Sequence, residues 1–467
     1  MKRIRFGALH EQRRSGKGPT TPAELLLALI AAAAVLLLGA TDADALPSFA
    51  RQTGLACSAC HTTFPELTPL GRTFKMHGYT TLALNDVLNE DGSNTVPPLE
   101  INRTFPLSVM FQTSFTRTNE AQPGKQNSSV EFPQQLSLFL SGEITPHIGT
   151  FLQATYSGLD GSFTLDNTDI RFANDTSIDG KELLYGATLN NNPTVEDPWN
   201  TLTAWGYPFA SADAAPVPDA AALVDGVLAQ QVAGLGGYAL WNKHLYTNVT
   251  VYRSAQINPP QPVTINNVAP YWRLAWQQNV GANYFEVGTY GLWAEVFPED
   301  TPSGPTDKYT DAAVDAQYER PIGKDFLSAH LNYIYQYENL GATHAMGGSS
   351  NDNNHLNTVR LDAIYHWRSQ LAFYLQWFLI NGNTDPLFYA PPTVSPGSPP
   401  PVTGSASGSP NSDGFKFEIA YYPWQNVRFS AMYTVYTQFN GAANDYNGTG
   451  RSAAANDTLY LLAWLNY

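Results

Sequence analysis

Residues 427–436 read VRFSAMYTVY, and the character of their side chains alternates from one residue to the next. One set of alternate positions is apolar and consists of Val427, Phe429, Ala431, Tyr433 and Val435. The other set is mostly polar and consists of Arg428, Ser430, Met432, Thr434 and Tyr436. Successive side chains of a strand point to opposite faces. The stretch therefore predicts a β-strand with an apolar face and a polar face.

The same period of two recurs along the chain, and it predicts sixteen strands. They lie near residues 105–117, 134–144, 148–157, 163–172, 182–190, 231–241, 245–253, 269–277, 284–295, 308–318, 325–337, 355–367, 369–380, 414–422, 427–437 and 458–467. A soluble β-sandwich also alternates, but many such strands with aromatic residues near their ends are typical of an apolar-out, polar-in barrel wall. The expected fold class is all-β, a transmembrane antiparallel β-barrel of about 16 strands.

The connections between these strands alternate between short and long. The long ones are residues 118–133, 191–230, 254–268, 338–354, 381–413 and 438–457. Outer-membrane barrels have short periplasmic turns and long external loops, so an even strand count leaves both termini in the periplasm. The segment 381–413 is rich in Pro, Ser and Gly and is expected to be a disordered external loop.

The N-terminal residues favour export. Met1–Pro22 is basic, Leu25–Gly39 is apolar, and Ala43-Asp44-Ala45 offers a small-residue cleavage site. A membrane anchor is the alternative, but the apolar run is short for a spanning helix. We therefore divide the chain into a signal peptide (1–45), a short N-terminal segment (46–102) and an outer-membrane β-barrel (103–467).

Composition narrows the possible functions. Only 14% of residues are charged, 12% are aromatic, and the formal net charge is −15. An acidic chain does not bind nucleic acid through its phosphates, whereas it could attract cations or a basic partner protein. The sequence contains no convincing Ser-His-Asp, P-loop or dinucleotide-binding motif.

Both cysteines of the chain lie in one pentapeptide, Cys57-Ser58-Ala59-Cys60-His61. The spelling C-x-x-C-H is the attachment site of a c-type haem, in which two thiols hold the porphyrin covalently and the histidine is the proximal iron ligand. A disulfide, a redox dithiol or half of a zinc site are the alternatives. The adjacent His61 and the lack of a second cysteine pair argue against zinc. We therefore predict one covalent haem c, with His61 as a metal ligand.

The distal iron ligand is less defined by the sequence. Met76 is the first choice, because thioether ligation raises the potential of a c-type haem. His77 is the alternative, followed by a barrel histidine such as His330 or His366, or an open site. Aromatic residues expected to line the ring are Phe49, Phe64, Phe74 and Tyr79. Candidate partners of the propionates are Arg51, Arg72 and Lys75, which could equally be solvated surface charges.

Residues 46–80, LPSFARQTGLACSACHTTFPELTPLGRTFKMHGYT, closely resemble the N-terminus of the fused outer-membrane monohaem cytochrome–porins of iron-oxidising bacteria. The resemblance rests on Pro47–Gly54, Cys57–His61, Phe64–Pro69 and Gly71–Lys75, followed by Gly78 and Tyr79. It implies a haem held in the pore of a barrel, electron uptake from an extracellular donor, and delivery to a periplasmic electron-carrier protein. In the best-known members the donor is Fe(II). The segment is too short for an independent cytochrome, so we expect it to plug the barrel.

These observations predict an electron-transfer cytochrome–porin of the cell outer membrane, an Fe(II):cytochrome c oxidoreductase that transfers one electron. One alternative is a diffusion porin whose haem segment is a structural plug. Others are the same conduit with a different donor, and a soluble periplasmic β-sandwich cytochrome. Glu299, Asp300 and Asp307 could concentrate Fe²⁺ at the mouth, although a solvated loop is the commoner role of such residues.

Overall fold

A computed structural model describes residues 48–81, 106–202, 204, 210–255, 263–298 and 303–467. The predicted signal peptide and residues 82–105 lie outside the described residues. Sixteen long strands form the wall: β1 (Leu107–Thr118), β2 (Ser129–Thr145), β3 (Ile148–Ser157), β4 (Ser162–Ile178), β5 (Lys181–Asn190), β6 (Val232–Trp241), β7 (Leu245–Ser254), β9 (Ala269–Val280), β10 (Asn283–Phe297), β11 (Asp307–Ile322), β12 (Asp325–Asn339), β13 (Asn353–Trp367), β14 (Leu371–Gly382), β15 (Ser412–Trp424), β16 (Val427–Gln438) and β17 (Thr458–Asn466). A two-residue strand, β8 (Thr264–Ile265), pairs with the end of β10.

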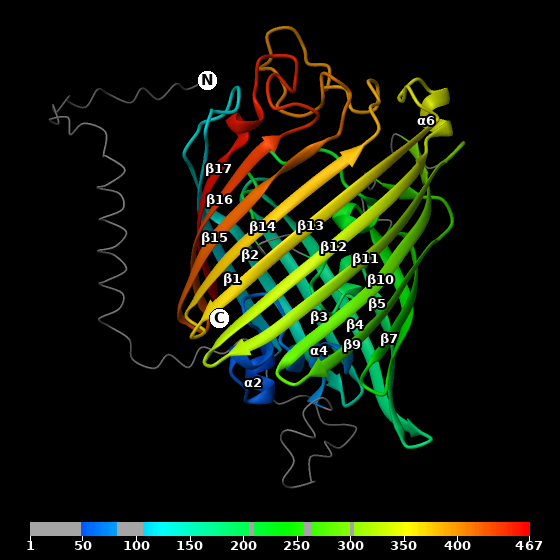
Figure 1. The fold of residues 1–467 in the computed structure, drawn as a ribbon, viewed down its shortest axis with the longest axis vertical. Coiled ribbons are helices and arrows are strands. Elements are labelled where there is room, and N and C mark those ends of the chain that lie inside the picture. Colours follow the sequence, from blue (N-terminus) through cyan, green and yellow to red (C-terminus); the bar gives the residue numbers. More distant parts are fainter. Residues whose placement is uncertain (1–47, 82–105, 203, 205–209, 256–262, 299–302) are drawn as a thin grey trace, which may run out of the picture. The chain divides into compact units, whose positions relative to one another are not determined.

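The strands close into a barrel. Each long strand pairs antiparallel with its neighbours in the chain, and β1 pairs with both β2 and β17. Because no edge is left in this sheet, the backbone groups of the wall can be satisfied within lipid. The predicted fold class is confirmed, and each of the sixteen predicted strands overlaps one strand of the wall (Figure 1).

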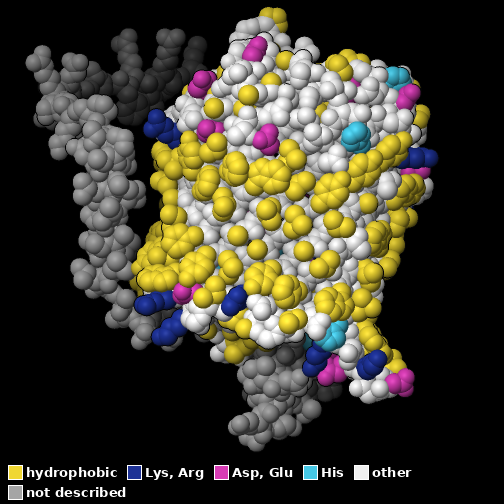
Figure 2. All heavy atoms as spheres, in the orientation of Figure 1, with side chains coloured by type: hydrophobic (Ala, Val, Ile, Leu, Met, Phe, Trp, Pro, Cys, Tyr) yellow, Lys and Arg dark blue, Asp and Glu magenta, His cyan; other side chains and the backbone are white. Residues whose placement is uncertain are grey.

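The two faces of the wall differ as the sequence pattern predicted. In β16 the side chains of Arg428, Ser430 and Met432 are buried, whereas Ala431 and Tyr433 are exposed. The exposed hydrophobic side chains of the other strands extend this outer surface, as in β14 (Phe373, Leu375) and β15 (Phe417, Ile419). Figure 2 shows hydrophobic side chains covering the wall between two end zones where charged residues gather. Such an apolar surface is that of a barrel embedded in lipid.

Among the described residues, three short helices precede the wall: α2 (Ser48–Thr53), α3 (Cys57–Cys60) and α4 (Pro69–Met76). We call residues 48–81 the plug, because their backbone and side-chain groups bind strands and turns of the barrel at the end where the strands are joined by short turns (Figure 1). The remaining short helices are η2 (Pro193–Glu196), η3 (Leu223–Val227), α6 (Gly341–Ala345) and η5 (Ala453–Asn456). Among the described residues, no helix is long and apolar enough to cross a membrane.

The connection 191–230 was predicted to be an external loop, but its described residues, which we call the interior segment, enter the barrel. Glu196 and Trp199 are fully buried, and Asp197 is nearly so. Arg171 of β4 pairs with Glu196, and Arg273 of β9 pairs with Asp197. The segment therefore lies in the lumen, where its carboxylates pair with buried arginines of the wall.

The prediction of disorder for residues 381–413 is wrong. Asp385 accepts hydrogen bonds from Ser349 and Asn354, and Ser405 N donates to the carbonyl of Tyr389. Gly404 N donates to Asp219 of the interior segment. The loop is ordered because these hydrogen bonds tie it to neighbouring loops, which its low-complexity sequence does not reveal.

Candidate functional site

The C-x-x-C-H pentapeptide forms a single helical turn that is tied to the next helix. His61 N donates to the carbonyl of Cys57 (2.9 Å), which closes the turn. Thr68 caps α4 by accepting a hydrogen bond from Gly71 N, and its hydroxyl donates to the carbonyl of Ala59 (2.6 Å). The threonine thus serves both as an N-cap and as the link between α3 and α4.

Gly71 allows the two helices to approach closely. A Cβ atom at this position would lie 2.1 Å from the carbonyl oxygen of Cys60. Because Gly71 has no side chain, α4 can pack directly against the turn that carries the cysteines.

Hydrogen bonds to distant parts of the chain fix the position of the plug. Cys57 N donates to the side chain of Gln425 in the β15–β16 turn (2.9 Å). Leu67 N donates to Asn200 of the interior segment (3.1 Å). Arg72 is 1% exposed and donates two hydrogen bonds to Glu319 of β11 (2.6 and 2.8 Å). The plug, with the turn that carries the cysteines, is thus held by the wall, by the β15–β16 turn and by the interior segment.

A second anchor is the buried carboxylate of Glu66. It accepts a hydrogen bond from Ser328 (2.7 Å), and the Nε2 atoms of His330 and His366 lie 3.5 Å from its two oxygens. Burial opposes ionisation of Glu66, but the contact with His366 and the charge of His330 outweigh it and lower the pKa to about 2. The other ring nitrogen of His330 lies 2.7 Å from Asp362. The two histidines therefore bind the plug to β12 and β13.

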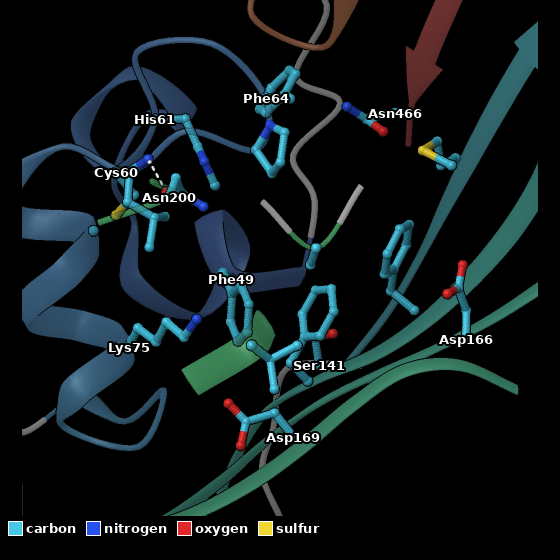
Figure 3. Close-up of a pocket in the computed structure, with 18 of the residues that line it drawn as sticks. Phe49, Cys60, His61, Phe64, Lys75, Ser141, Asp166, Asp169, Asn200 and Asn466 are labelled. Carbon is cyan, nitrogen blue, oxygen red and sulfur yellow. Dashed lines mark hydrogen bonds between the residues drawn. The ribbon is translucent and has the colours of Figure 1, made fainter. Parts of the chain in front are cut away.

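A cavity of about 600 Å³ opens beside the pentapeptide. Cys57, Cys60 and His61 form part of its lining, together with the apolar side chains of Phe139, Phe151 and Trp464 from the wall. Figure 3 shows Phe49, Cys60, His61, Phe64 and Lys75 around this space. Its volume lies within the range of ~300–1,000 Å³ typical of cofactor sites.

The imidazole of His61 has the protonation state that a metal ligand requires. Burial lowers the pKa of His61, so the imidazole is neutral at pH 7, the form that binds metals. Its Nδ1 atom is buried and has no hydrogen-bond partner among the described residues. Phe64 packs against the ring edge with centroids 5.3 Å apart. Both cysteines are free thiols, so no disulfide competes for them.

The predicted aromatic residues Phe49, Phe64, Phe74 and Tyr79 all line the cavity. Phe49 stacks on Tyr79 (5.7 Å) and meets Phe74 edge-on (5.1 Å). Tyr79 also donates a hydrogen bond to Asp169 of β4 (2.6 Å). The four rings, which the sequence pattern singled out together, thus border one space, with Phe49, Phe74 and Tyr79 in mutual contact and Phe64 beside His61.

The predicted basic residues divide into two groups. Lys75 lines the cavity, where burial lowers its pKa to about 8. Arg51 and Arg72 are not among the lining residues. Arg51 donates to the carbonyl of Leu107 at the start of β1, and Arg72 pairs with Glu319. The structure therefore gives both arginines a role in docking the plug.

The predicted distal ligands are not brought to the cavity. Met76 is 2% exposed and packs in a cluster with Trp199, Tyr238 and Tyr246. His77 lies 2.7 Å from the carbonyl of Thr73 and 3.3 Å from Asp175. His330 and His366 face Glu66.

The lining also includes residues that the sequence did not single out. Met110 of β1 offers a thioether, and Arg360 of β13 offers a guanidinium that pairs with Asp225 of η3. Both occupy inward positions of an alternating strand, which is the signal that could have placed them in the lumen. Which inward positions meet the plug depends on the closed barrel, not on local sequence.

The residues present fit a haem c. A covalent porphyrin needs two thiols, an apolar chamber and a neutral imidazole, and Cys57, Cys60, His61 and the aromatic lining supply these groups. Lys75 and Arg360 are the basic side chains among the lining residues. Among the described residues, no group of three or more His, Cys, Asp or Glu side chains converges as a site for a bare metal ion.

No protein-family model matches the sequence, and no curated protein sequence does. Solved structures with a similar fold include OprB of Pseudomonas putida, with 9% identity and a TM-score of 0.47 over 77% of this chain and 94% of that one. OmpF of Salmonella typhi, in complex with daunomycin, shows 13% identity and a TM-score of 0.44 over 77% and 97%. The anion-selective porin of Comamonas acidovorans shows 11% identity and a TM-score of 0.45 over 77% and 98%. The closed antiparallel barrel of this chain is established by its own strand pairing.

Proposed function

We propose that the protein is an outer-membrane electron-transfer cytochrome–porin with one haem c. Cys57 and Cys60 hold the haem covalently, and His61 is the proximal ligand. An extracellular donor, Fe(II) in the favoured case, supplies one electron at a time, and a periplasmic electron-carrier protein accepts it.

The observation that carries the proposal is the position of the pentapeptide. Cys57, Cys60 and His61 border a cavity of about 600 Å³ that the plug, the interior segment and the wall enclose together. The hydrocarbon core of a membrane is about 30 Å thick and blocks electron transfer unless a redox centre lies within it. A haem in this cavity would provide such a centre.

The chain's own residues would set the properties of that haem. The bound group supplies the one-electron redox couple, and burial, charge and the axial ligand tune its potential. The aromatic rings of Phe49, Phe74 and Tyr79 contribute apolar surface to the cavity. The ammonium of Lys75 is held by the carbonyl of Asp197 (3.3 Å) and contributes positive charge for anionic substituents.

The first test is the covalent haem itself. Mature protein purified from outer membranes should carry the mass of one haem, and the visible spectrum should be that of a c-type cytochrome. Cys57→Ala and Cys60→Ala together should abolish both signals while the barrel still folds. A native protein without the added mass would overturn the proposal.

The second test concerns the donor. Rapid mixing of the reconstituted oxidised protein with Fe(II) should reduce the haem, and ascorbate provides a control reductant. If ascorbate reduces the haem and Fe(II) does not, at a driving force that permits it, the electron conduit stands with a different donor.

A diffusion porin with a structural plug is the second candidate, because the plug's ion pairs need no redox chemistry. Arg72–Glu319 and the Glu66 cluster are stable anchors that hold the segment in the lumen with or without redox chemistry. Solute flux through liposomes separates the two functions, because a porin passes small sugars and an electron conduit need not.

A further inference from the structure

A buried carboxylate in this barrel needs donors or a cation to hold its charge. Asp307 of β11 is 2% exposed and caps α6 by accepting hydrogen bonds from Ala342 N and Thr343 N. A solvated-loop role for Asp307 is therefore wrong, while Glu299 and Asp300 lie outside the described residues. Such full pairing is the normal state of a buried polar group.

Three other buried carboxylates meet at a single arginine. The Nη2 atom of Arg273 in β9 lies 3.3 Å from Asp197 of the interior segment and 3.4 Å from Glu286 of β10. The same atom donates a hydrogen bond to Asp315 of β11. All four side chains are at most 2% exposed. We call them the Arg273 cluster, and with every group ionised it holds three negative charges against one positive charge.

The other titratable groups around Glu286 and Asp315 do not offset this excess. Arg72 of α4 also acts on Glu286 through its charge, but Arg72 is paired with Glu319. Tyr284 and Tyr290 of β10 interact with the two carboxyl groups, and phenols are neutral near pH 7. Among the described residues, no second Lys, Arg or His forms an ion pair with Glu286 or Asp315.

A threonine hydroxyl shows where a proton fits. Thr201 Oγ1 lies 2.9 Å from Asp197 and 2.5 Å from Asp315. A hydroxyl has one hydrogen to donate, so a protonated carboxyl that donates to the threonine oxygen satisfies the second contact. Asp197 also accepts hydrogen bonds from the backbone N atoms of Trp199 and Leu202, which suits a carboxylate. The proton therefore belongs on the side of Asp315.

Glu286 and Asp315 are placed to share that proton. Asp315 lies opposite Gly288 in the strand register, two residues from Glu286. A Cβ atom at Gly288 would lie 2.4 Å from Oδ1 of Asp315 and 2.7 Å from Oε1 of Glu286, so the two carboxyl groups meet beside this glycine. Oδ1 of Asp315 and Oε2 of Glu286 are buried without a hydrogen-bond partner among the described residues. Close carboxyl groups in such a site retain one proton between them.

Hydrogen bonds connect this carboxyl pair to the cavity beside the pentapeptide. Asp197 lines that cavity and also contacts Arg273. The Thr201 hydroxyl joins Asp197 to Asp315. The series Asp197, Thr201, Asp315 therefore leads from the cavity to the pair.

We propose that Glu286 and Asp315 share one proton, and that they bind it more tightly when the haem is reduced. The second part rests on the proposed function. Reduction adds one negative charge to the cavity, so the affinity of the pair for a proton rises. Over the pH window between the two affinities, one electron from the donor reduces the ferric iron, and one proton from solvent converts a carboxylate of the pair to a carboxyl group.

Linkage gives the sign of the effect on the haem. Below this window the proton is bound in both redox states, and above it in neither. Within the window, reduction takes up a proton, so the midpoint potential falls as the pH rises. The coupling is reciprocal, because the haem and the pair change each other's affinity by the same factor.

Infrared spectroscopy tests the shared proton directly. The protein in detergent near neutral pH should show the carbonyl stretch of a protonated carboxyl group. Glu286→Gln and Asp315→Asn should each remove the same band, because either substitution ends the conflict between like charges. Glu319→Gln is the matched control, since Glu319 is equally buried on β11 but is paired one to one with Arg72. The band should persist in this variant.

Potentiometric titration at a series of pH values tests the coupling to the haem. The midpoint potential of the unmodified protein should fall with rising pH more steeply than that of Glu286→Gln or Asp315→Asn. An infrared band that persists in both variants, or a pH dependence that neither variant changes, would overturn the inference. A protein without haem would refute the proposed function, and the infrared band would then decide by itself whether the pair holds a proton.

Discussion

Two thioethers are candidates for the distal ligand of the proposed haem, and their surroundings differ. Met110 lines the cavity beside the pentapeptide, with its sulfur 3.5 Å from the amide of Gln112. Met76 lies in an aromatic cluster, and Tyr238 donates a hydrogen bond to its carbonyl (2.7 Å). For Met76 to reach an iron atom in the cavity, the end of α4 would have to leave that cluster.

We therefore expect Met76→Leu to leave the haem spectrum unchanged and Met110→Leu to remove the thioether-to-iron charge-transfer band of the oxidised protein. Optical spectra with a potentiometric titration measure both effects, since loss of a thioether ligand lowers the potential. Loss of the band in Met76→Leu alone would restore the assignment made from the sequence.

The Arg72–Glu319 pair offers a test of how the plug is held. Arg72→Met leaves Glu319 buried and unpaired, which should reduce the free energy of unfolding by about 3–5 kcal/mol. Adding Glu319→Gln should recover most of that loss. The midpoint of urea unfolding in detergent, followed through the haem absorbance, gives the values.

The exposed pair Lys243–Glu182 is the control for this experiment. Lys243→Met should cost less than about 1 kcal/mol, because exposed ion pairs contribute little. Equal losses at the two sites would show that the buried pair does not anchor the plug.

At the scale of elements, two general rules predict opposite effects on stability when Gly71 in α4 is replaced by alanine. Helix propensity predicts that Gly71→Ala stabilises the helix by about 1 kcal/mol. The new Cβ would lie 2.1 Å from the carbonyl oxygen of Cys60, and overpacking of this kind costs about 1–3 kcal/mol or more. We expect the clash to dominate, so the yield of haem-loaded protein should fall.

Thr73→Ala is the comparison for Gly71→Ala, because Thr73 is on the same helix and its hydroxyl bonds only locally to the carbonyl of Pro69 among the described contacts. Its haem content, measured by absorbance per protein, should stay unchanged. A Gly71→Ala protein with full haem content would mean that α3 and α4 need not pack closely.

The sequence predicted the wall well because each strand carries its own signal. In β16 the alternation of Arg428, Ser430 and Met432 with apolar neighbours depends on nothing outside the strand. The interior segment carries no such signal. Trp199 is buried, and its indole donates a hydrogen bond to Tyr284 of β10 (2.6 Å). Tyr284 is far along the chain, so the local sequence does not reveal this contact.

The residues of the candidate site likewise fall into those that the sequence could predict and those that it could not. The pentapeptide and the aromatic residues of the plug were predictable because they are close in sequence and their chemistry is specific. The docking roles of Arg51 and Arg72 were not, because Leu107 and Glu319 become their partners only when the barrel closes. The same holds for Met110, whose place in the cavity follows from the position of the plug against β1.

At the scale of the molecule, the lumen is divided rather than open. The plug lies at the short-turn end, and residues 219–230 line both the cavity beside the pentapeptide and a second cavity of about 630 Å³. Barrels whose lumen is filled by an internal domain do not pass solutes freely. A conduit for electrons needs no aqueous path, so the same architecture that blocks sugars can serve electron transfer.

We therefore expect liposomes that contain the protein to take up small sugars at least about ten-fold more slowly than liposomes that contain a variant without residues 46–102, because that variant lacks one of the two segments that fill the lumen. Deleting residues 393–398 from the loop at the other end should leave the rate unchanged. Swelling measured by light scattering gives both rates.

If the full protein already passes sugars as fast as the shortened one, the lumen is a solute pore and the diffusion-porin function is favoured. If it excludes sugars while external ferricyanide oxidises its reduced haem, electrons cross a barrel that solutes cannot.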